Sequence, residues 1–161
     1  MVITRNRIIL TVAFLSGIAA VFIADHVHVS PEERIKATID DIKDALETGN
    51  PEGVMEHISD TFSAQGLTAD DIRMIAKQFC GAADTISIRV RRTEVHISGD
   101  FASATVSVIS RSENGRFYGP SSWALDLARE GEVWRVTRIT PLAIGQRPVT
   151  DWDNLLQSYF F

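Results

Sequence analysis

The stretch from Ser30 to Phe62, SPEERIKATIDDIKDALETGNPEGVMEHISDTF, decides how the chain begins to fold. Ser30, Pro31 and Glu33 fit the cap, the first and the third position of a helix that starts with a capping box. Four apolar residues then recur at helical spacing and lay one stripe along the helix: Ile35, Ile39, Ile42 and Leu46. Gly49-Asn50-Pro51 ends this helix and starts a second, short one.

The chain after Phe62 changes from helical to strand periodicity. Thr68 and Asp71 predict the cap of a third helix, whose stripe is Ile72, Ile75 and Phe79. Beyond it, apolar and polar residues alternate through four segments separated by turn signals at Ser98-Gly99-Asp100, Glu113-Asn114-Gly115 and Glu130-Gly131-Glu132. The alternation slips near Arg91-Arg92-Thr93, which predicts a β-bulge.

Three helices followed by an antiparallel four-stranded meander define an α+β fold class, with the helices packed on one face of a curved sheet. This order, the opening helix and the ending GEVWRVTRITPL at 131–142 resemble the nuclear-transport-factor-2-like superfamily, also called SnoaL-like or cystatin-like. The resemblance covers about residues 30–144. It implies a cone, in which the sheet wraps around the first helix and leaves an apolar pocket between them.

The amino-terminal segment predicts a membrane anchor. Ile8 to Ala24 is a run of 17 uncharged residues preceded by Arg5 and Arg7, which places the amino terminus on the cytoplasmic side. A cleaved secretion signal is the alternative, with Gly17-Ile18-Ala19 as its cleavage site. The chain then divides into an anchor at 1–29, the α+β domain at 30–144 and a tail at 145–161. In a bacterium, the domain would lie on the periplasmic side of the inner membrane.

The charge and cysteine content limit the partners of the exported part. Arg5 and Arg7 are the basic residues of the first 24 positions, so 14 of the 16 basic and all 21 acidic side chains follow, a net charge of −7. This negative charge argues against nucleic acid as a partner, because proteins bind nucleic acid through basic patches. Cys80 is the single cysteine and excludes an internal disulfide.

Candidate pocket residues are His57, His96, Tyr118 and Asp126. Asp126 and His96 alternate with apolar neighbours and are expected to face solvent, which leaves His57 and Tyr118 as pocket candidates. No two of the four can be placed on one face, as an acid–base pair would require, and none matches a family catalytic motif. His26 and His28 lack a third metal ligand nearby. The sequence therefore predicts no catalytic residue, no cofactor and no metal.

The carboxyl-terminal tail carries an aromatic helical face: Trp152, Leu155, Leu156, Tyr159 and Phe160. Two interpretations of this face are equally supported. The face folds back on its own sheet, or it docks on another protein, since aromatic anchors dominate interface energy.

These features favour a non-catalytic accessory or assembly subunit of a larger membrane complex, whether respiratory, photosynthetic or secretory. Its partners would be the membrane, through residues 8–24, and other subunits, or a second copy through the sheet face. The alternative is a small-molecule-binding protein, or a SnoaL-like lyase or isomerase that uses the cone pocket. A filled cone would favour the accessory subunit. A deep apolar cavity that contains an ionisable pair would favour the alternative.

Overall fold

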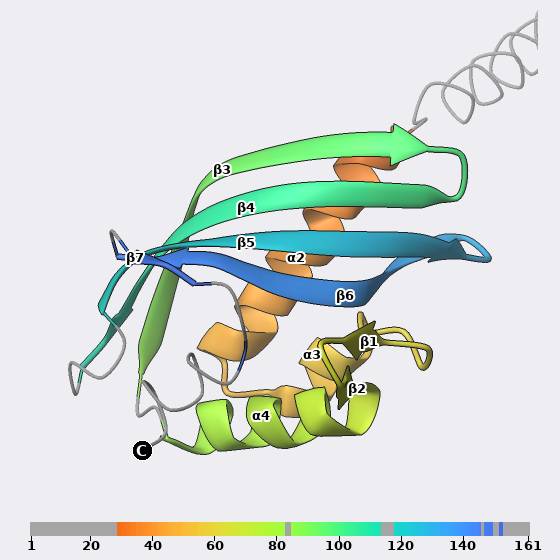
Figure 1. Ribbon diagram of the computed structural model, residues 1–161. Coiled ribbons are helices and arrows are strands. Elements are labelled where there is room, and N and C mark those ends of the chain that lie inside the picture. The colour runs from red at the N-terminus through yellow and green to blue at the C-terminus, as the bar shows by residue number, and fades with distance from the viewer. Residues whose placement is uncertain (1–28, 83–84, 114–117, 146, 150–151, 153–161) are drawn as a thin grey trace, which may run out of the picture. The chain divides into compact units, whose positions relative to one another are not determined.

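The computed structural model describes residues 29–82, 85–113, 118–145, 147–149 and 152. The helices are α2 (Pro31–Glu47), α3 (Pro51–Met55) and α4 (Ala69–Ala82). The strands are β1 (Ser63–Ala64), β2 (Leu67–Thr68), β3 (Ile86–Ser98), β4 (Phe101–Ser112), β5 (Tyr118–Glu130), β6 (Val133–Ile144) and β7 (Arg147–Pro148). The structure confirms the predicted α+β class, in which three helices precede the large sheet in the sequence (Figure 1).

Two of the helices start where the sequence predicts a cap. Asn50 precedes α3, and its side chain accepts a hydrogen bond of 3.0 Å from the backbone N–H of Gly53. Thr68 precedes α4, and its N–H and hydroxyl both donate to Asp71 Oδ2 at 2.8 Å. These side chains satisfy backbone donors that the first turn of a helix leaves without a partner.

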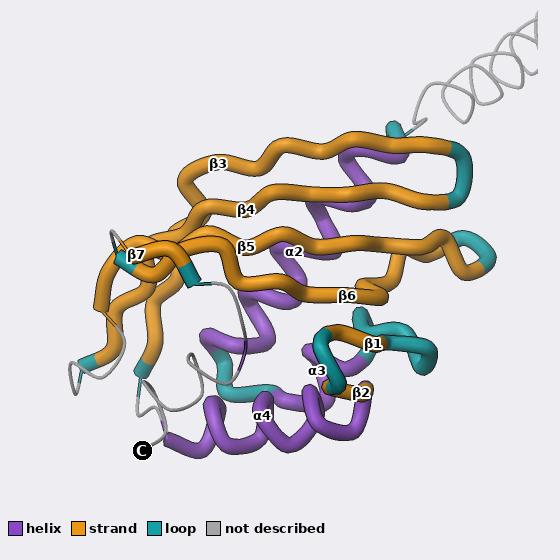
Figure 2. The backbone as a smooth tube through the Cα atoms, viewed as in Figure 1, coloured by secondary structure: helices purple, strands orange, loops and turns teal. Residues whose placement is uncertain are grey.

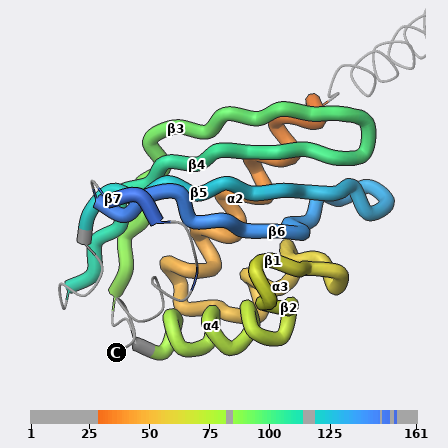
Figure 3. The backbone as a smooth tube through the Cα atoms, in the orientation of Figure 1, coloured from red at the N-terminus to blue at the C-terminus, as the bar shows by residue number. Residues whose placement is uncertain are grey.

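The large sheet is an antiparallel meander in the order β3-β4-β5-β6-β7 (Figure 3). The pairing of β3 with β4 shifts register between Val90 and Arg92, which confirms the predicted bulge. Gly99 and Gly131, each with a positive φ, occupy the turns between β3 and β4 and between β5 and β6. Glycine adopts this backbone without a Cβ clash.

The prediction of four strands is wrong by one, because a fifth strand joins the sheet. Gly145, with φ +61°, reverses the chain after β6, and β7 pairs with Ala143 and Ile144. Two residues are too few to show an alternating pattern, so the sequence does not reveal β7. This strand lies beyond residue 144, the predicted end of the domain. The separate two-stranded sheet β1-β2 was also not predicted, for the same reason.

The helices pack on the inner face of the sheet and build one apolar core. In Figure 2, α2 crosses behind the long strands while α3 and α4 lie below them, and α2 contacts both β3 and β6. The core is continuous from helices to sheet, and its most buried members are Ile35, Ile58, Ala64, Ala104, Leu127 and Val136. Backbone bonds also join the two layers, since Ser59 N–H donates to Val136 O at 2.9 Å and Val136 N–H donates to His57 O at 2.8 Å.

Within the described part of the chain, which starts at Val29, none of the helices is long and apolar enough to cross a membrane. The predicted anchor and the alternative cleavage site both fall in residues 1–28, outside the described residues.

Candidate functional site

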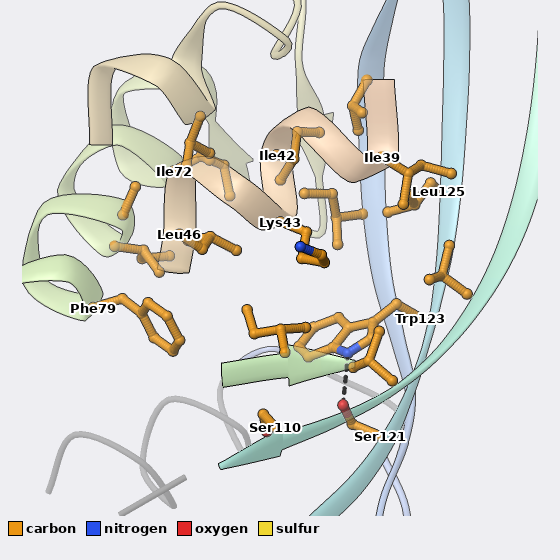
Figure 4. Close-up of a pocket in the computed structure, with 18 of the residues that line it drawn as sticks. Ile39, Ile42, Lys43, Leu46, Ile72, Phe79, Ser110, Ser121, Trp123 and Leu125 are labelled. Atoms are coloured by element: carbon orange, nitrogen blue, oxygen red, sulfur yellow. Dashed lines mark hydrogen bonds between the residues drawn. The ribbon is translucent and has the colours of Figure 1, made fainter. Parts of the chain in front are cut away.

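A cavity of about 280 Å³ lies between α2, α4 and the inner face of the sheet (Figure 4). Its wall is almost entirely hydrocarbon. Helical residues of the wall include Ile39, Ile42, Leu46, Ile72, Ile75 and Phe79, and strand residues include Ile88, Val90, Val106, Val108, Leu125 and Ile139. Ile42, Leu46 and Ile75 are only partly buried. Some residues of the predicted apolar stripes therefore pack in the core, and others face the open space of the cavity.

Two tryptophans form an aromatic part of the wall. Trp123 comes from β5, and its indole N–H donates to Ser121 Oγ at 3.0 Å. Trp152 comes from the chain after β7, is buried, and donates from its indole N–H to Ile139 O at 3.0 Å. Its backbone N–H donates to Gln65 Oε1 at 3.1 Å. The backbone and the ring of Trp152 are thus both fixed, and burial of the indole N–H is compensated by a partner.

Lys43 is the one titratable side chain among the described residues that line the cavity. Its ammonium group forms ion pairs with Asp44 and, at 2.9 Å, with Glu47 Oε2. The hydrogen bond to Asp44, followed by that to Glu47, raises the pKa of Lys43. Lys43 therefore carries its charge throughout the neutral and mildly alkaline range.

The second oxygen of Glu47 holds the helix to the sheet. Glu47 Oε1 accepts the backbone N–H of Ile88 at 2.5 Å. Ile88 lies on β3, at the edge of the sheet, opposite Ser110 of β4. Ile88 and Ser110 also line the cavity. The Lys43–Glu47 pair therefore lies where α2 meets β3, and Lys43, Ser110 and Ser121 are the polar residues of a largely apolar described lining.

The residues proposed from the sequence as pocket candidates do not gather in this cavity. His57 is not part of its lining, and its Nε2 lies 3.9 Å from Asp41 Oδ2. Asp126 forms an ion pair with Arg138 at 3.8 Å, and His96 is exposed. The backbone of Tyr118 starts β5, opposite Arg111, while its side chain is outside the described part of the chain.

The tail is described at one position, Trp152, where the chain folds back on its own sheet. Only 7% of this residue is exposed, which leaves little of it for a partner to contact. Leu155, Leu156, Tyr159 and Phe160 lie outside the described residues, so their docking role stays a prediction. His26 and His28 also lie outside, and the described residues contain no group of three potential metal ligands.

Sequence reasoning missed Lys43 and Glu47, although their spacing carries a signal. Lys43 follows Ile39 by four positions and Ile42 by one, so it projects from the apolar stripe itself. Glu47 comes four residues later, at the distance that favours an ion pair on a helix. A charged pair on the apolar face of a helix indicates a cavity or a polar contact inside the fold.

Solved structures of several proteins are similar to this chain. A protein of unknown function from Pseudomonas putida KT2440, described as NTF2-like, aligns with 18% identity and a TM-score of 0.59 over 73% of this chain and 92% of its own. A Caulobacter vibrioides protein with a cystatin-like fold aligns with 20% identity and a TM-score of 0.61 over 71% of this chain and 90% of its own. Bd1075 of Bdellovibrio bacteriovorus aligns with 12% identity and a TM-score of 0.62 over 70% of this chain, which spans only 40% of that longer protein.

Other similar structures are named as candidate dehydratases and as a candidate ketosteroid isomerase. No protein-family model matches the sequence, and no curated protein is significantly similar to it. The chain has the nuclear-transport-factor-2-like cone fold, which confirms the resemblance seen in the sequence. At these identities the likeness concerns the fold alone.

Proposed function

We propose that this domain binds an apolar small molecule in the cavity of its cone and carries out no reaction on it. The observation that carries the proposal is the composition of the wall, in which hydrocarbon side chains surround a space of about 280 Å³. An apolar cavity of about 150 Å³ in another protein stays dry and binds benzene. The present cavity therefore suits a ligand of about two fused rings, or an aliphatic molecule of similar volume.

The cavity favours this function over the accessory-subunit hypothesis, for which a filled cone would be the expected geometry. With the predicted anchor at residues 8–24, the binding domain would act at the periplasmic face of the inner membrane, close to a source of apolar molecules. The anchor and the binding function are separate proposals, and either can hold without the other.

The titratable groups also favour binding over catalysis. A general acid or base works best with a pKa near the operating pH. Lys43 is the one such group among the described lining residues, and its ion pairs raise its pKa away from neutrality. The cavity thus offers shape and apolar contact, but its described wall offers no group suited to proton transfer at neutral pH.

A calorimetric titration of the full chain with naphthalene tests this proposal. We expect saturable binding with one molecule per chain. Val108→Phe should abolish it by filling the cavity, while Ile109→Phe on the same strand should not, because Ile109 is 36% exposed and does not line the cavity. Circular dichroism would establish that both variants are folded. Equal binding by the two variants, or no binding by the wild type, would contradict the proposal.

A further inference from the structure

We infer that the ligand of this cavity is an uncharged apolar molecule with one hydrogen-bond acceptor, such as a ketone, an aldehyde or an ester, and that Lys43 recognises the acceptor. This inference rests on the proposed function and names the ligand class for the same site. Apolar pockets commonly fix the orientation of their ligands with a small number of polar groups. The described lining of the cavity has few polar residues, and Lys43 is the charged one.

The Lys43 ammonium has the geometry of such a recognition group. It has three N–H donors, and the structure shows acceptors for two of them, on Asp44 and Glu47. Figure 4 places Lys43 between the helical residue Ile42 and Trp123, against the open space. A further donor can therefore point to a ligand without breaking either ion pair. The ion pairs also hold the flexible lysine side chain in place, which reduces the entropy lost on binding.

The charges around Lys43 select against an anionic ligand. One ammonium stands beside two carboxylates, those of Asp44 and Glu47, so the cluster carries a net charge of −1. The raised pKa of Lys43 keeps this balance constant around neutral pH. A ligand carboxylate would meet an ammonium whose charge is already compensated, together with a surplus negative charge, and would lose its own hydration. A neutral acceptor has a smaller desolvation cost and gains a hydrogen bond to a charged donor.

Ser110 adds a further polar group to the cavity wall. Its side chain lines the cavity, and its hydroxyl forms no hydrogen bond with another residue in the described part of the chain. Ser110 is paired across the sheet with Ile88, whose backbone N–H donates to Glu47 Oε1. A hydroxyl donates or accepts as required, so it is compatible with a neutral ligand and adds no charge.

Three matched ligands and two variants test the inference on the full chain. The ligands are naphthalene, acetonaphthone and naphthoate, which share one ring system and differ in having no acceptor, a neutral acceptor or a charged one. Dissociation constants are measured by calorimetry at neutral pH. We expect acetonaphthone to bind about tenfold more tightly than naphthalene, as one charge-assisted hydrogen bond allows, and naphthoate to bind most weakly.

The variants separate the role of Lys43 from the role of the apolar wall. Lys43→Met keeps an unbranched side chain of similar length, so naphthalene should bind as before while the tenfold preference for acetonaphthone disappears. Glu47→Gln removes one negative charge and keeps an oxygen for Ile88 N–H, so it should raise the affinity for naphthoate. Tight binding of naphthoate by the wild type, or an unchanged preference for acetonaphthone in Lys43→Met, would overturn the inference. Failure of all three ligands to bind would instead overturn the proposed function.

Discussion

The indole rings of Trp123 and Trp152 lie with their centroids 5.9 Å apart and their planes tilted by 45°. The first ring belongs to β5 and the second to the chain after β7, so residues 29 positions apart close one wall of the cavity. Ring pairs at this distance contribute stability beyond their buried area. The cavity is therefore completed by a residue that lies after the last strand of the sheet.

Trp152 is predicted to stabilise the whole domain. Trp152→Ala should lower the free energy of unfolding by about 3 kcal/mol, because it removes a buried indole group and its hydrogen bond to Ile139 O. Urea denaturation measures the loss. Phe101→Ala is the matched control, since Phe101 is 69% exposed and its loss should cost no more than about 0.5 kcal/mol. Equal effects of the two substitutions would show that Trp152 is not held in the wall.

Ser59 is predicted to be a stability residue at the junction of helices and sheet. Its side chain is fully buried, and its Oγ lies 2.6 Å from Glu130 Oε1 and accepts the N–H of Thr61 at 3.1 Å. Ser59→Ala leaves the Thr61 N–H without this acceptor, so the free energy of unfolding should fall by about 1–2 kcal/mol. Ser103→Ala, at an exposed position of β4, should change it by less than about 0.5 kcal/mol. A loss at Ser59 as small as that at Ser103 would contradict the structure.

The cap of α4 predicts a pH dependence. Two hydrogen bonds lower the pKa of Asp71, and the one from the backbone N–H of Thr68 has a larger effect than the one from the Thr68 hydroxyl. A carboxylate with a lowered pKa in the folded state stabilises the fold fully above its unfolded value of about 3.9, and this contribution disappears as the pH falls through the folded value. The melting temperature of wild type should therefore exceed that of Asp71→Asn at neutral pH, and the two should converge in acid.

A second variant tests the cause of that pH dependence. Thr68→Val removes the hydroxyl and keeps the backbone N–H. In a chain that carries Thr68→Val, the substitution Asp71→Asn should therefore lower the melting temperature by less than it does in the wild type, without losing its effect entirely. A pH-independent difference between wild type and Asp71→Asn would contradict the assignment.

The fold could be predicted from the sequence where a pattern repeats. The stripe that contains Ile35 and Ile39 indicates α2, and the alternation broken after Val90 indicates a bulged β3. The two-residue strand β7 has no such repeat. The inward side of the sheet was also predictable, since Trp123 and Leu125 share a face of β5. The cavity on that side was expected from the family resemblance and not from the periodicity, because periodicity tells which side chains face inward and not whether they fill the space between the layers.

The candidate site was predicted less well than the fold. His57 was chosen for its chemistry, and chemistry alone does not place a side chain in a cavity. Lys43 was passed over because a lysine is ordinarily solvated, although its position on the stripe puts it among apolar residues. The position of Trp152 depends on the reversal at Gly145 and on contacts with Gln65 and Ile139, which are distant in the sequence.

The uncharged run from Ile8 to Ala24 gives a prediction about location. Expressed in a bacterium, the full chain should stay in the membrane fraction after an alkaline carbonate wash, because an embedded helix is not released by removing charge contacts. A chain that starts at Val29 should be recovered in the soluble fraction. Recovery from the full-length gene of a product that begins after Ala19 and is free of the membrane would support the cleaved signal instead.

Intermolecular nuclear Overhauser effects between bound naphthalene and the methyl groups of the full chain test the central claim most directly. A ligand in the cone should give contacts to Ile39, Val108 and Leu125, which line the cavity from the helix and the sheet. Contacts confined to Ile97, Ile109 and Leu142, which are exposed, would show that the cavity is not the binding site and would contradict the account.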